Sequence, residues 1–329
     1  MRRVKMTTLA VLALCTVFIA GCGRHSKKEV YYLISVSTKL PYWQTMAAGF
    51  NQAAEEYGVT AKVVGPEGYD SQAELTELQR AVATKPAGIL ISVSDPSVLS
   101  PEINAAVNAG IPVITVDSDA VGSRRLFFVG TNNLEAGRLG GRRVVDRLEG
   151  KGNVVIFTLA GQPNIEERLK GIKDVFSDYP AMKIVDVVDI KGNTVKAFDE
   201  TRKYMAQTGD NKVDAFICLD SASGKIVSDA IKRTGATDRV LVAWDVNEDT
   251  LNAIKDGDID STVAQKPFTM GYVGLRVLDQ VYHNPPKNMT RDWSADPFSP
   301  FPVFVDTGTS LVDKSNVDTY LEAAARMKH

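Results

Sequence analysis

From Val30 onward, short apolar runs alternate with amphipathic stretches of helical length. The runs have the length and composition of buried strands, and the stretches between them repeat apolar residues at i, i+3 and i+4. The strand candidates are VYYLISVS, AKVVG, AGILISV, PVITVD, RLFFVG, NVVIFTL, MKIVDVVD, DAFICLD, RVLVAWD, STVAQ and FPVFVD. Such alternation predicts βαβ units, and therefore an α/β protein whose parallel sheets are covered by helices on both faces. A chain of 329 residues exceeds the usual size of one domain, so we expect two.

Among the apolar runs that end on a carboxylate are those that end at Asp117, Asp220 and Asp245, and another run ends on the amide of Gln265. In parallel α/β sheets, ligands bind in the crevice beyond the carboxyl ends of the strands. A carboxylate at that rim avoids the full desolvation cost of the interior. The alternative is that each Asp caps the helix that follows it, since Asp is a favoured N-cap residue. Four polar strand ends together favour one shared ligand site.

The first 21 residues have the pattern of a secretion signal. Arg2, Arg3 and Lys5 precede an apolar run that ends in IAGC at Cys22 and is too short for a comfortable membrane span of about 20 residues. The IAGC ending resembles the lipobox of bacterial lipoproteins, in which the cysteine becomes the lipidated first residue of the mature chain. We therefore expect a signal peptide at 1–21 and a lipidated tether at 22–29, held to a membrane through Cys22. An uncleaved anchor helix, or an ordinary signal with a chance cysteine, would also export the protein.

Charge and motifs argue against several other functions. The net charge is −2 and no basic block occurs, so nucleic-acid binding is not expected. The dinucleotide, P-loop and serine-hydrolase fingerprints are missing, so we expect no enzyme activity and no cofactor. A carboxylate pair could hydrolyse glycosides, but the sequence does not supply the separation which that mechanism requires. His25, His283 and His329 show no ligand spacing, which predicts that the chain has no metal site.

Six motifs occur in an order and at spacings that resemble a known family. They are STKLPYW, PVITVDSD, VGTNNLEAGRLGG, QPNIEERLKGIKDVF, VAWD and TVAQKPFTMG. With them, the chain from about Val30 to the last helix resembles the type I periplasmic binding proteins of sugar importers, and the ribose-binding proteins most closely. The resemblance implies two similar Rossmann-like lobes that close on a ligand by hinge motion. They would be joined by three crossings, near Asn133, near Gln265 and after about Asn288. The implied lobes are 30–133 plus 266–290, the N-terminal lobe, and 134–265 plus 291–329, the C-terminal lobe.

The resemblance also implies a set of ligand-binding residues in this sequence. They are the aromatic pair Tyr42 and Trp43, the strand-ending acids Asp117, Asp220 and Asp245, the helical Arg168, the amide Gln265, and Ser118. Aromatic faces suit the C–H surface of a sugar ring, while carboxylates and a guanidinium suit its hydroxyls. The aromatic pair could instead be core packing. Arg168 could lie on a solvated helix face, although no carboxylate stands three or four residues away to pair with it.

Two positions depart from the ribose-binding pattern. Ribose binders follow the strand-four acid with an arginine, where this chain has Ser118 and so lacks one bidentate contact. Leu219 stands where relatives often have an asparagine before the acid matched by Asp220. The prediction is therefore a small neutral sugar or polyol, without ribose being specified. Three acids against Arg168 disfavour an anionic ligand.

The resemblance implies a monomer that delivers its ligand to the permease of an ATP-binding-cassette (ABC) importer, outside the cytoplasm. A receptor that reports a sugar or a furanosyl signal to a membrane sensor or chemotaxis system would use the same fold and location. Regulators of the lac-repressor type share the two-lobe core, but they carry a helix-turn-helix segment where this chain has an export signal.

Overall fold

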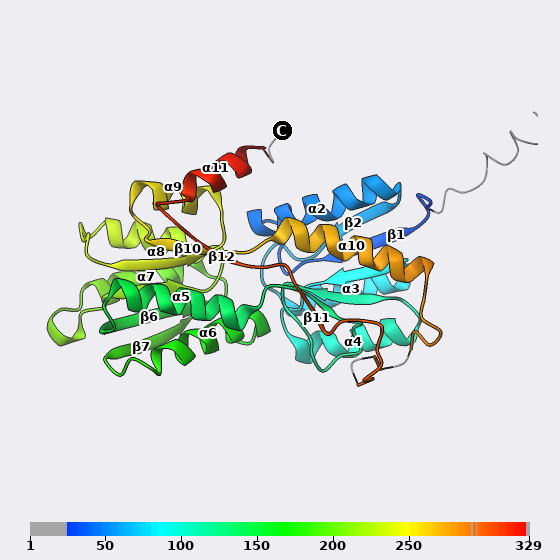
Figure 1. Cartoon of the computed structure of the whole chain (residues 1–329), viewed down its shortest axis with the longest axis horizontal. Coiled ribbons are helices and arrows are strands. Elements are labelled where there is room, and N and C mark those ends of the chain that lie inside the picture. Colours follow the sequence, from blue (N-terminus) through cyan, green and yellow to red (C-terminus); the bar gives the residue numbers. More distant parts are fainter. Residues whose placement is uncertain (1–24, 291, 294, 327–329) are drawn as a thin grey trace, which may run out of the picture.

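The computed structural model describes residues 25–290, 292–293 and 295–326. These residues form two α/β lobes, each built around a six-stranded sheet (Figure 1). The predicted α/β class with two similar lobes is therefore confirmed. The predicted signal peptide and the lipid anchor at Cys22 lie outside the described residues. Within the described ranges, no helix combines the length and apolar character needed to cross a membrane.

The first sheet has the strand order β11-β5-β4-β3-β1-β2, and all of its neighbouring strands are parallel. Its strands are β1 (Val30–Ile34), β2 (Thr60–Val64), β3 (Gly88–Ile91), β4 (Val113–Val116), β5 (Phe128–Gly130) and β11 (Phe304–Asp306). Its helices are α2 (Pro41–Tyr57), α3 (Ser71–Ala83), α4 (Pro96–Asn108) and α10 (Pro267–His283).

Helices cover both faces of this sheet, as the near-continuous apolar strands predict. Along β1, Tyr31 and Leu33 join the core cluster that contains α2 and α10, whereas Tyr32 and Ile34 join the cluster that contains α3 and α4. Successive side chains of a strand point to opposite faces, so one short strand supplies two cores.

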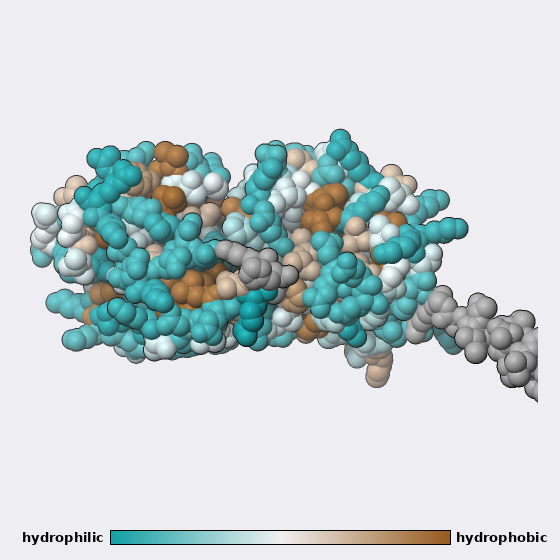
Figure 2. Space-filling model, turned by 90° about the horizontal axis from the view of Figure 1, so that it is seen from above, coloured by the Kyte–Doolittle hydropathy of each residue, from teal (hydrophilic) through white to brown (hydrophobic). Residues whose placement is uncertain are grey.

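The second sheet has the order β12-β10-β9-β8-β6-β7, and only its edge strand β12 is antiparallel to its neighbour. Its strands are β6 (Gly152–Thr158), β7 (Met182–Asp189), β8 (Ala215–Cys218), β9 (Val240–Trp244), β10 (Ser261–Ala264) and β12 (Ser310–Asp313). Its helices are α5 (Asn133–Arg147), α6 (Pro163–Phe176), α7 (Thr194–Met205), α8 (Ser223–Lys232), α9 (Glu248–Asp256) and α11 (Val317–Arg326), with a short 3₁₀ turn at Gly209–Asn211. Figure 2 shows the two lobes as separate masses with a notch between them and a mostly hydrophilic surface.

The chain crosses between the lobes at residues 131–132, 265–266 and 307–309. The third crossing comes later than the predicted one after about Asn288, so the assignment of all of 291–329 to the second lobe is wrong. β11 pairs in parallel with β5 of the first sheet, and Phe301 packs on the core of that lobe. Only after Asp306 does the chain pass over to pair β12 with β10.

Candidate ligand-binding site

Asp117 and Asp245 occupy equivalent places in the two lobes. Asp117 directly follows β4 and Asp245 directly follows β9, and each of these strands is the third from one edge of its sheet. Each also has a left-handed backbone, with φ of 63° at Asp117 and 67° at Asp245. Asp is one of the few residues that adopts this conformation at small cost. The chain therefore turns sharply after each strand and leaves a carboxylate, 5% exposed in both cases, at the end of the sheet.

These two carboxylates line one cavity between the lobes, together with most of the predicted residues. The lining includes Tyr42, Trp43, Asp117, Arg168, Asp220, Asp245 and Gln265. It also includes residues that were not predicted, among them Tyr69, Gln162 and Asn164. Ser118 is buried and is the predicted residue that is absent from this lining, so its part in ligand binding stays a prediction.

Asp117 is held by hydrogen bonds from both lobes. Its Oδ1 accepts from the Tyr42 hydroxyl at 2.6 Å, and its Oδ2 accepts from the Ser92 hydroxyl at 3.3 Å. The side-chain amide of Asn164, on α6 of the second lobe, also donates to Oδ2, at 3.1 Å. Asp117 thus joins the lobes directly across the cavity.

Arg168 is buried in the second lobe, 2% exposed, and does not lie on a solvated helix face. Its Nε donates to Asn133 Oδ1 at 2.9 Å, and its Nη1 donates to the carbonyl of Leu219 at 2.7 Å. Its guanidinium carbon lies 5.2 Å from the ring centre of Trp244. Its Nη2 has no hydrogen-bond partner among the described residues. The side chain is therefore fixed on one side and has a donor left over.

Close packing of α5 on α6 sets the position of this arginine. A Cβ atom on Gly137 of α5 would lie 2.1 Å from the carbonyl oxygen of Arg168, so only glycine allows the two helices to approach this closely. Pro163 opens α6 just past the end of β6, where its missing N–H costs no helical hydrogen bond. The arginine is thereby placed one turn into the helix, beside the ends of the strands.

Asp245 and Asp220 differ in what their oxygens already bind. Asp245 Oδ1 accepts from the Gln265 amide at 2.9 Å, which joins two of the predicted residues. Asp220 Oδ1 instead accepts from the backbone N–H groups of Ala222 and Ser223, at 2.8 and 3.0 Å, at the start of α8. Asp220 therefore binds the turn that leads into α8, two residues before the N-cap Ala222, and also lines the cavity.

The aromatic side of the cavity comes from the first lobe. The rings of Tyr42 and Trp43 meet edge to face, with centroids 5.1 Å apart, and both are nearly buried. Both belong to the core cluster of that lobe, so the packing alternative is also correct for them. Tyr69 follows β2 and contacts core residues of both lobes, which places a third aromatic ring at the junction.

Burial changes the acidity of the cavity's carboxyl groups. It raises the pKa of Asp245 to about 7 and raises that of Asp117, while the charge of Arg168 opposes both shifts. Burial and the neighbouring Asp117 raise the pKa of the Tyr42 hydroxyl well above its usual value, so it remains a hydrogen-bond donor. These groups lose their hydrogen bonds to water in the folded state. A ligand that forms hydrogen bonds with them would replace those bonds.

The lobes are closed over the site in this structure. The remaining free space is about 20 Å³, enough for one water molecule, whereas small-molecule sites usually enclose about 300–1,000 Å³. A sugar-sized ligand can enter only if the lobes move apart and the Asn164–Asp117 contact opens.

Far from this cavity, the structure brings two of the histidines close to one carboxylate. His25 and His283, which show no ligand spacing in the sequence, lie on either side of the Asp279 carboxylate. His25 and Asp279, which are 254 residues apart in the chain, are brought together because β1 begins where α10 ends.

Comparison with known proteins identifies the family. The family model described as periplasmic binding protein domain matches residues 31–284. The chain belongs to this family. The ribose import binding protein of Bacillus subtilis (strain 168) is 24% identical over 273 residues, which cover 78% of this chain and 83% of that protein.

Solved structures agree with this assignment. AraP, an arabinose binding protein from Geobacillus stearothermophilus, is 32% identical with a TM-score of 0.74, and the match covers 89% of this chain and 99% of that one. XylFII, in a complex with LytSN, is 27% identical with a TM-score of 0.77, and the match covers 87% of this chain and 98% of that one. The two-lobe architecture is thus that of a periplasmic binding protein over almost the whole folded part.

Proposed function

We propose that this periplasmic binding protein is an exported lipoprotein that captures a small neutral sugar or polyol between its lobes and delivers it to an ABC importer. It acts as a monomer, without a cofactor and without catalysis, and is anchored by lipid on Cys22. Its family membership and the relatives named for ribose and arabinose support the ligand class.

One observation carries the proposal: unpartnered buried polar atoms converge on the cavity beside aromatic rings. Arg168 Nη2 is a donor and Gln265 Oε1 is an acceptor, and neither has a hydrogen-bond partner within the described residues. Each hydroxyl of a sugar donates and accepts at once, so a polyhydroxylated ring satisfies both kinds of atom. The rings of Tyr42 and Trp43 suit the C–H face of such a ring.

The balance of charge supports a neutral ligand. Asp117, Asp220 and Asp245 face one guanidinium, that of Arg168, in a buried cavity. An anion would enter an environment that is already acidic, in which Arg168 is the one cation among the lining residues. A hydroxyl costs little to desolvate by comparison and can donate to these carboxylates.

A thermal-shift screen across pentoses, hexoses, polyols and aminosugars tests the proposal, followed by calorimetry on the compounds that raise the melting temperature. A ligand that binds only the folded state at 100 times its Kd stabilises that state by about 2.7 kcal/mol. We expect one or a few neutral compounds from the panel to do so. If the panel leaves the melting temperature unchanged while an anion or a peptide raises it, the sugar assignment is wrong.

The lipid anchor has its own test. We expect mass spectrometry of the mature protein to find acyl chains on Cys22, and Cys22→Ala to move the protein out of the membrane fraction. An unmodified N-terminal segment on membrane-free protein would contradict the anchor and leave the ligand proposal intact.

A receptor role remains the second candidate, because XylFII, a protein of the same fold, forms a complex with a second protein, LytSN. Deleting the chain's gene separates the two roles. Loss of ligand uptake supports delivery to an importer, whereas normal uptake with loss of the transcriptional or chemotactic response to the ligand supports a receptor.

A further inference from the structure

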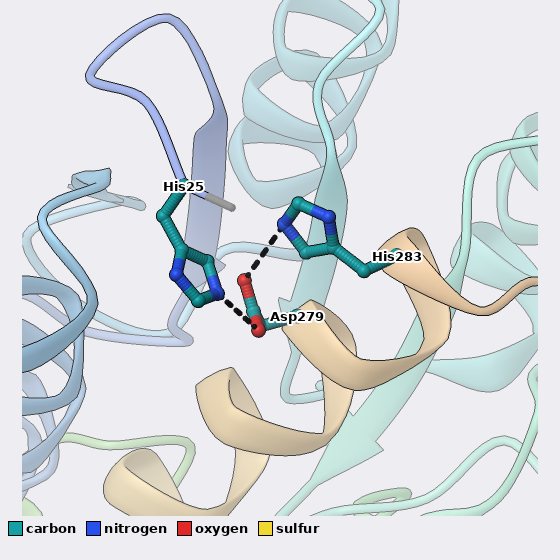
Figure 3. A group of neighbouring side chains, drawn as sticks. All are labelled: His25, Asp279 and His283. Carbon is teal, nitrogen blue, oxygen red and sulfur yellow. Dashed lines mark hydrogen bonds and ion pairs between the residues drawn. The ribbon is translucent and has the colours of Figure 1, made fainter. Parts of the chain in front are cut away.

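A compact group of metal-ligating side chains lies at the far end of the first lobe from the cavity. Figure 3 shows the imidazoles of His25 and His283 on either side of the Asp279 carboxylate. Nε2 of His25 is 3.0 Å from Oδ2, and Nε2 of His283 is 3.5 Å from Oδ1. All three ligand atoms lie within 4.8 Å of one another. From this geometry we propose that His25, Asp279 and His283 bind a divalent transition-metal ion of the zinc type.

The distances suit such an ion. Zinc bonds to nitrogen and oxygen of about 2.0–2.2 Å hold tetrahedral ligand atoms roughly 3.3–3.6 Å apart. The two histidine–carboxylate separations, 3.0 and 3.5 Å, lie close to this value. These two distances go to different oxygens of Asp279, and the three ligand atoms are up to 4.8 Å apart, so they must draw closer on binding. His25 stands at the margin of the group, its side chain 23% exposed, and has room to shift.

A second carboxylate borders the group beside His283. Oε2 of Glu29 lies 3.0 Å from Nε2 of His283, and the Glu29 side chain is 12% exposed. The group itself, two imidazoles and one carboxylate, matches the ligands that zinc prefers, whereas calcium and magnesium prefer oxygen ligands alone. The set therefore selects against the hard cations.

The charge of the group points the same way. Asp279 is 5% exposed, and its ionic partners within the described ranges are the two histidines, with no lysine or arginine. Neutral imidazoles would leave the carboxylates of Glu29 and Asp279 without a counter-charge in a mostly buried place, which is costly. One divalent cation balances both. The competing explanation is that protons on the two imidazoles supply this charge instead, in a purely hydrogen-bonded network.

The surroundings hold the ligands in orientation, as outer-shell groups do in metal sites. The Tyr31 hydroxyl donates to Asp279 Oδ1 at 3.2 Å. The ring of His25 stacks on Tyr57 with centroids 4.8 Å apart and planes 5° from parallel. The ring of His283 meets the edge of Tyr282 at 5.3 Å. Both imidazoles are thereby presented with Nε2 toward the carboxylate.

Occupation of this site would fasten the segment ahead of β1 to the end of α10. His283 is the last residue of α10, whose first residue, Pro267, stands two residues after the cavity-lining Gln265. A helix of 17 residues rises about 25 Å along its axis. The proposed metal site is thus remote from the cavity, and it can be tested without disturbing ligand binding.

The test is calorimetric titration of zinc chloride into the full chain, purified in detergent without a polyhistidine tag and stripped with EDTA. We expect one zinc ion per chain, no binding of magnesium or calcium, and a higher melting temperature with zinc. His25→Gln and His283→Gln should each weaken zinc binding by about tenfold or more, and Asp279→Asn should do the same. His329→Gln, which alters the chain's third histidine, is the matched control and should leave binding unchanged.

Two results would overturn the proposal. The first is an absence of zinc binding to the stripped wild-type chain at neutral pH, which would assign the group to a hydrogen-bonded network. The second is zinc binding that persists in both His25→Gln and His283→Gln, which would place the ion elsewhere. His25 lies ahead of the first strand and Asp279→Asn preserves shape, so neither variant is expected to unfold.

Discussion

Replacing Asp117 with asparagine should separate ligand affinity from stability. Asparagine has the shape of aspartate and also adopts a left-handed backbone, so the φ of 63° at this position is retained. The substitution removes a negative charge and turns one acceptor oxygen into a donor NH₂ group. Alanine would confuse the test, because it would add backbone strain at this φ.

The expected loss of affinity follows from the hydrogen bonds at this carboxylate. Hydrogen bonds to charged groups contribute about 1.5–3 kcal/mol against about 0.5–1.5 for neutral ones, so two ligand hydroxyls would lose roughly 2–3 kcal/mol, or about 30- to 150-fold in Kd. Stability should not fall with it. Burial raises the pKa of Asp117, which means that its ionised form is unfavourable in the folded protein, and the substitution removes that cost.

Calorimetry with the ligand found in the screen measures the affinity, and urea denaturation measures the free energy of unfolding. Asp119→Asn is the matched control: Asp119 is two residues away and pairs with the buried Arg125, outside the cavity lining. It should lose stability and keep affinity. Unchanged affinity in Asp117→Asn would refute the site, and loss of the fold would show that Asp117 is structural.

Three further outcomes are expected. Ligand hydroxyls that donate to Asp245 need its carboxyl group ionised, and burial raises the pKa of that group to about 7. Calorimetry should therefore show the ligand affinity falling below pH 7, by up to about tenfold per pH unit. Asp245→Asn should make the affinity independent of pH in this range. Burial raises the pKa of Glu74 to about 8, whereas the unfolded chain releases that proton near pH 4.3. Between these two pH values the free energy of unfolding should fall as pH rises, by at most about 1.4 kcal/mol per pH unit. Urea titrations should show this slope, and Glu74→Gln should reduce it. Gly271→Ala would place a Cβ 2.1 Å from the Met46 carbonyl oxygen, and denaturation should show a loss of about 1–3 kcal/mol from overpacking of α10 on α2.

Local patterns predicted the fold and the strand-end acids well, because both depend on short-range sequence. An apolar run that ends on Asp places that residue at the rim of a parallel sheet whatever the rest of the chain does. What such a run cannot tell is how the next residue points. Ser118, which directly follows Asp117, is absent from the cavity lining, and the turn ahead of α8 already occupies one oxygen of Asp220.

Some lining residues carried a signal that was missed. Asn164 stands four residues before Arg168 on the same helix, so the two share a face, and Asn164 binds Asp117 across the cavity. Tyr69 follows the carboxyl end of β2, the same edge that holds the acids. Asn164 could have been predicted from its helical spacing to Arg168, and Tyr69 from its place after the carboxyl end of a parallel strand.

Other features depend on contacts that only the folded chain creates. His25 and His283 meet because β1 begins beside the end of α10, and no spacing in the sequence encodes that. The three residues of β11 could pair with either lobe by pattern alone. Their partner is decided by the preceding segment, where Met289 and Phe301 pack on the first core.

The late third crossing limits how the two lobes can separate. β11 borders one sheet and β12 borders the other, and only residues 307–309 connect them. Three extended residues reach about 10–11 Å. Near this crossing the two lobes can therefore rotate relative to one another, but they cannot move far apart. A chain that stopped short of Phe304 would uncover β5 and β10 together, and bare strand edges invite pairing with other molecules. Loss of the chain from Phe304 onward would thus expose an edge strand in each of the two lobes.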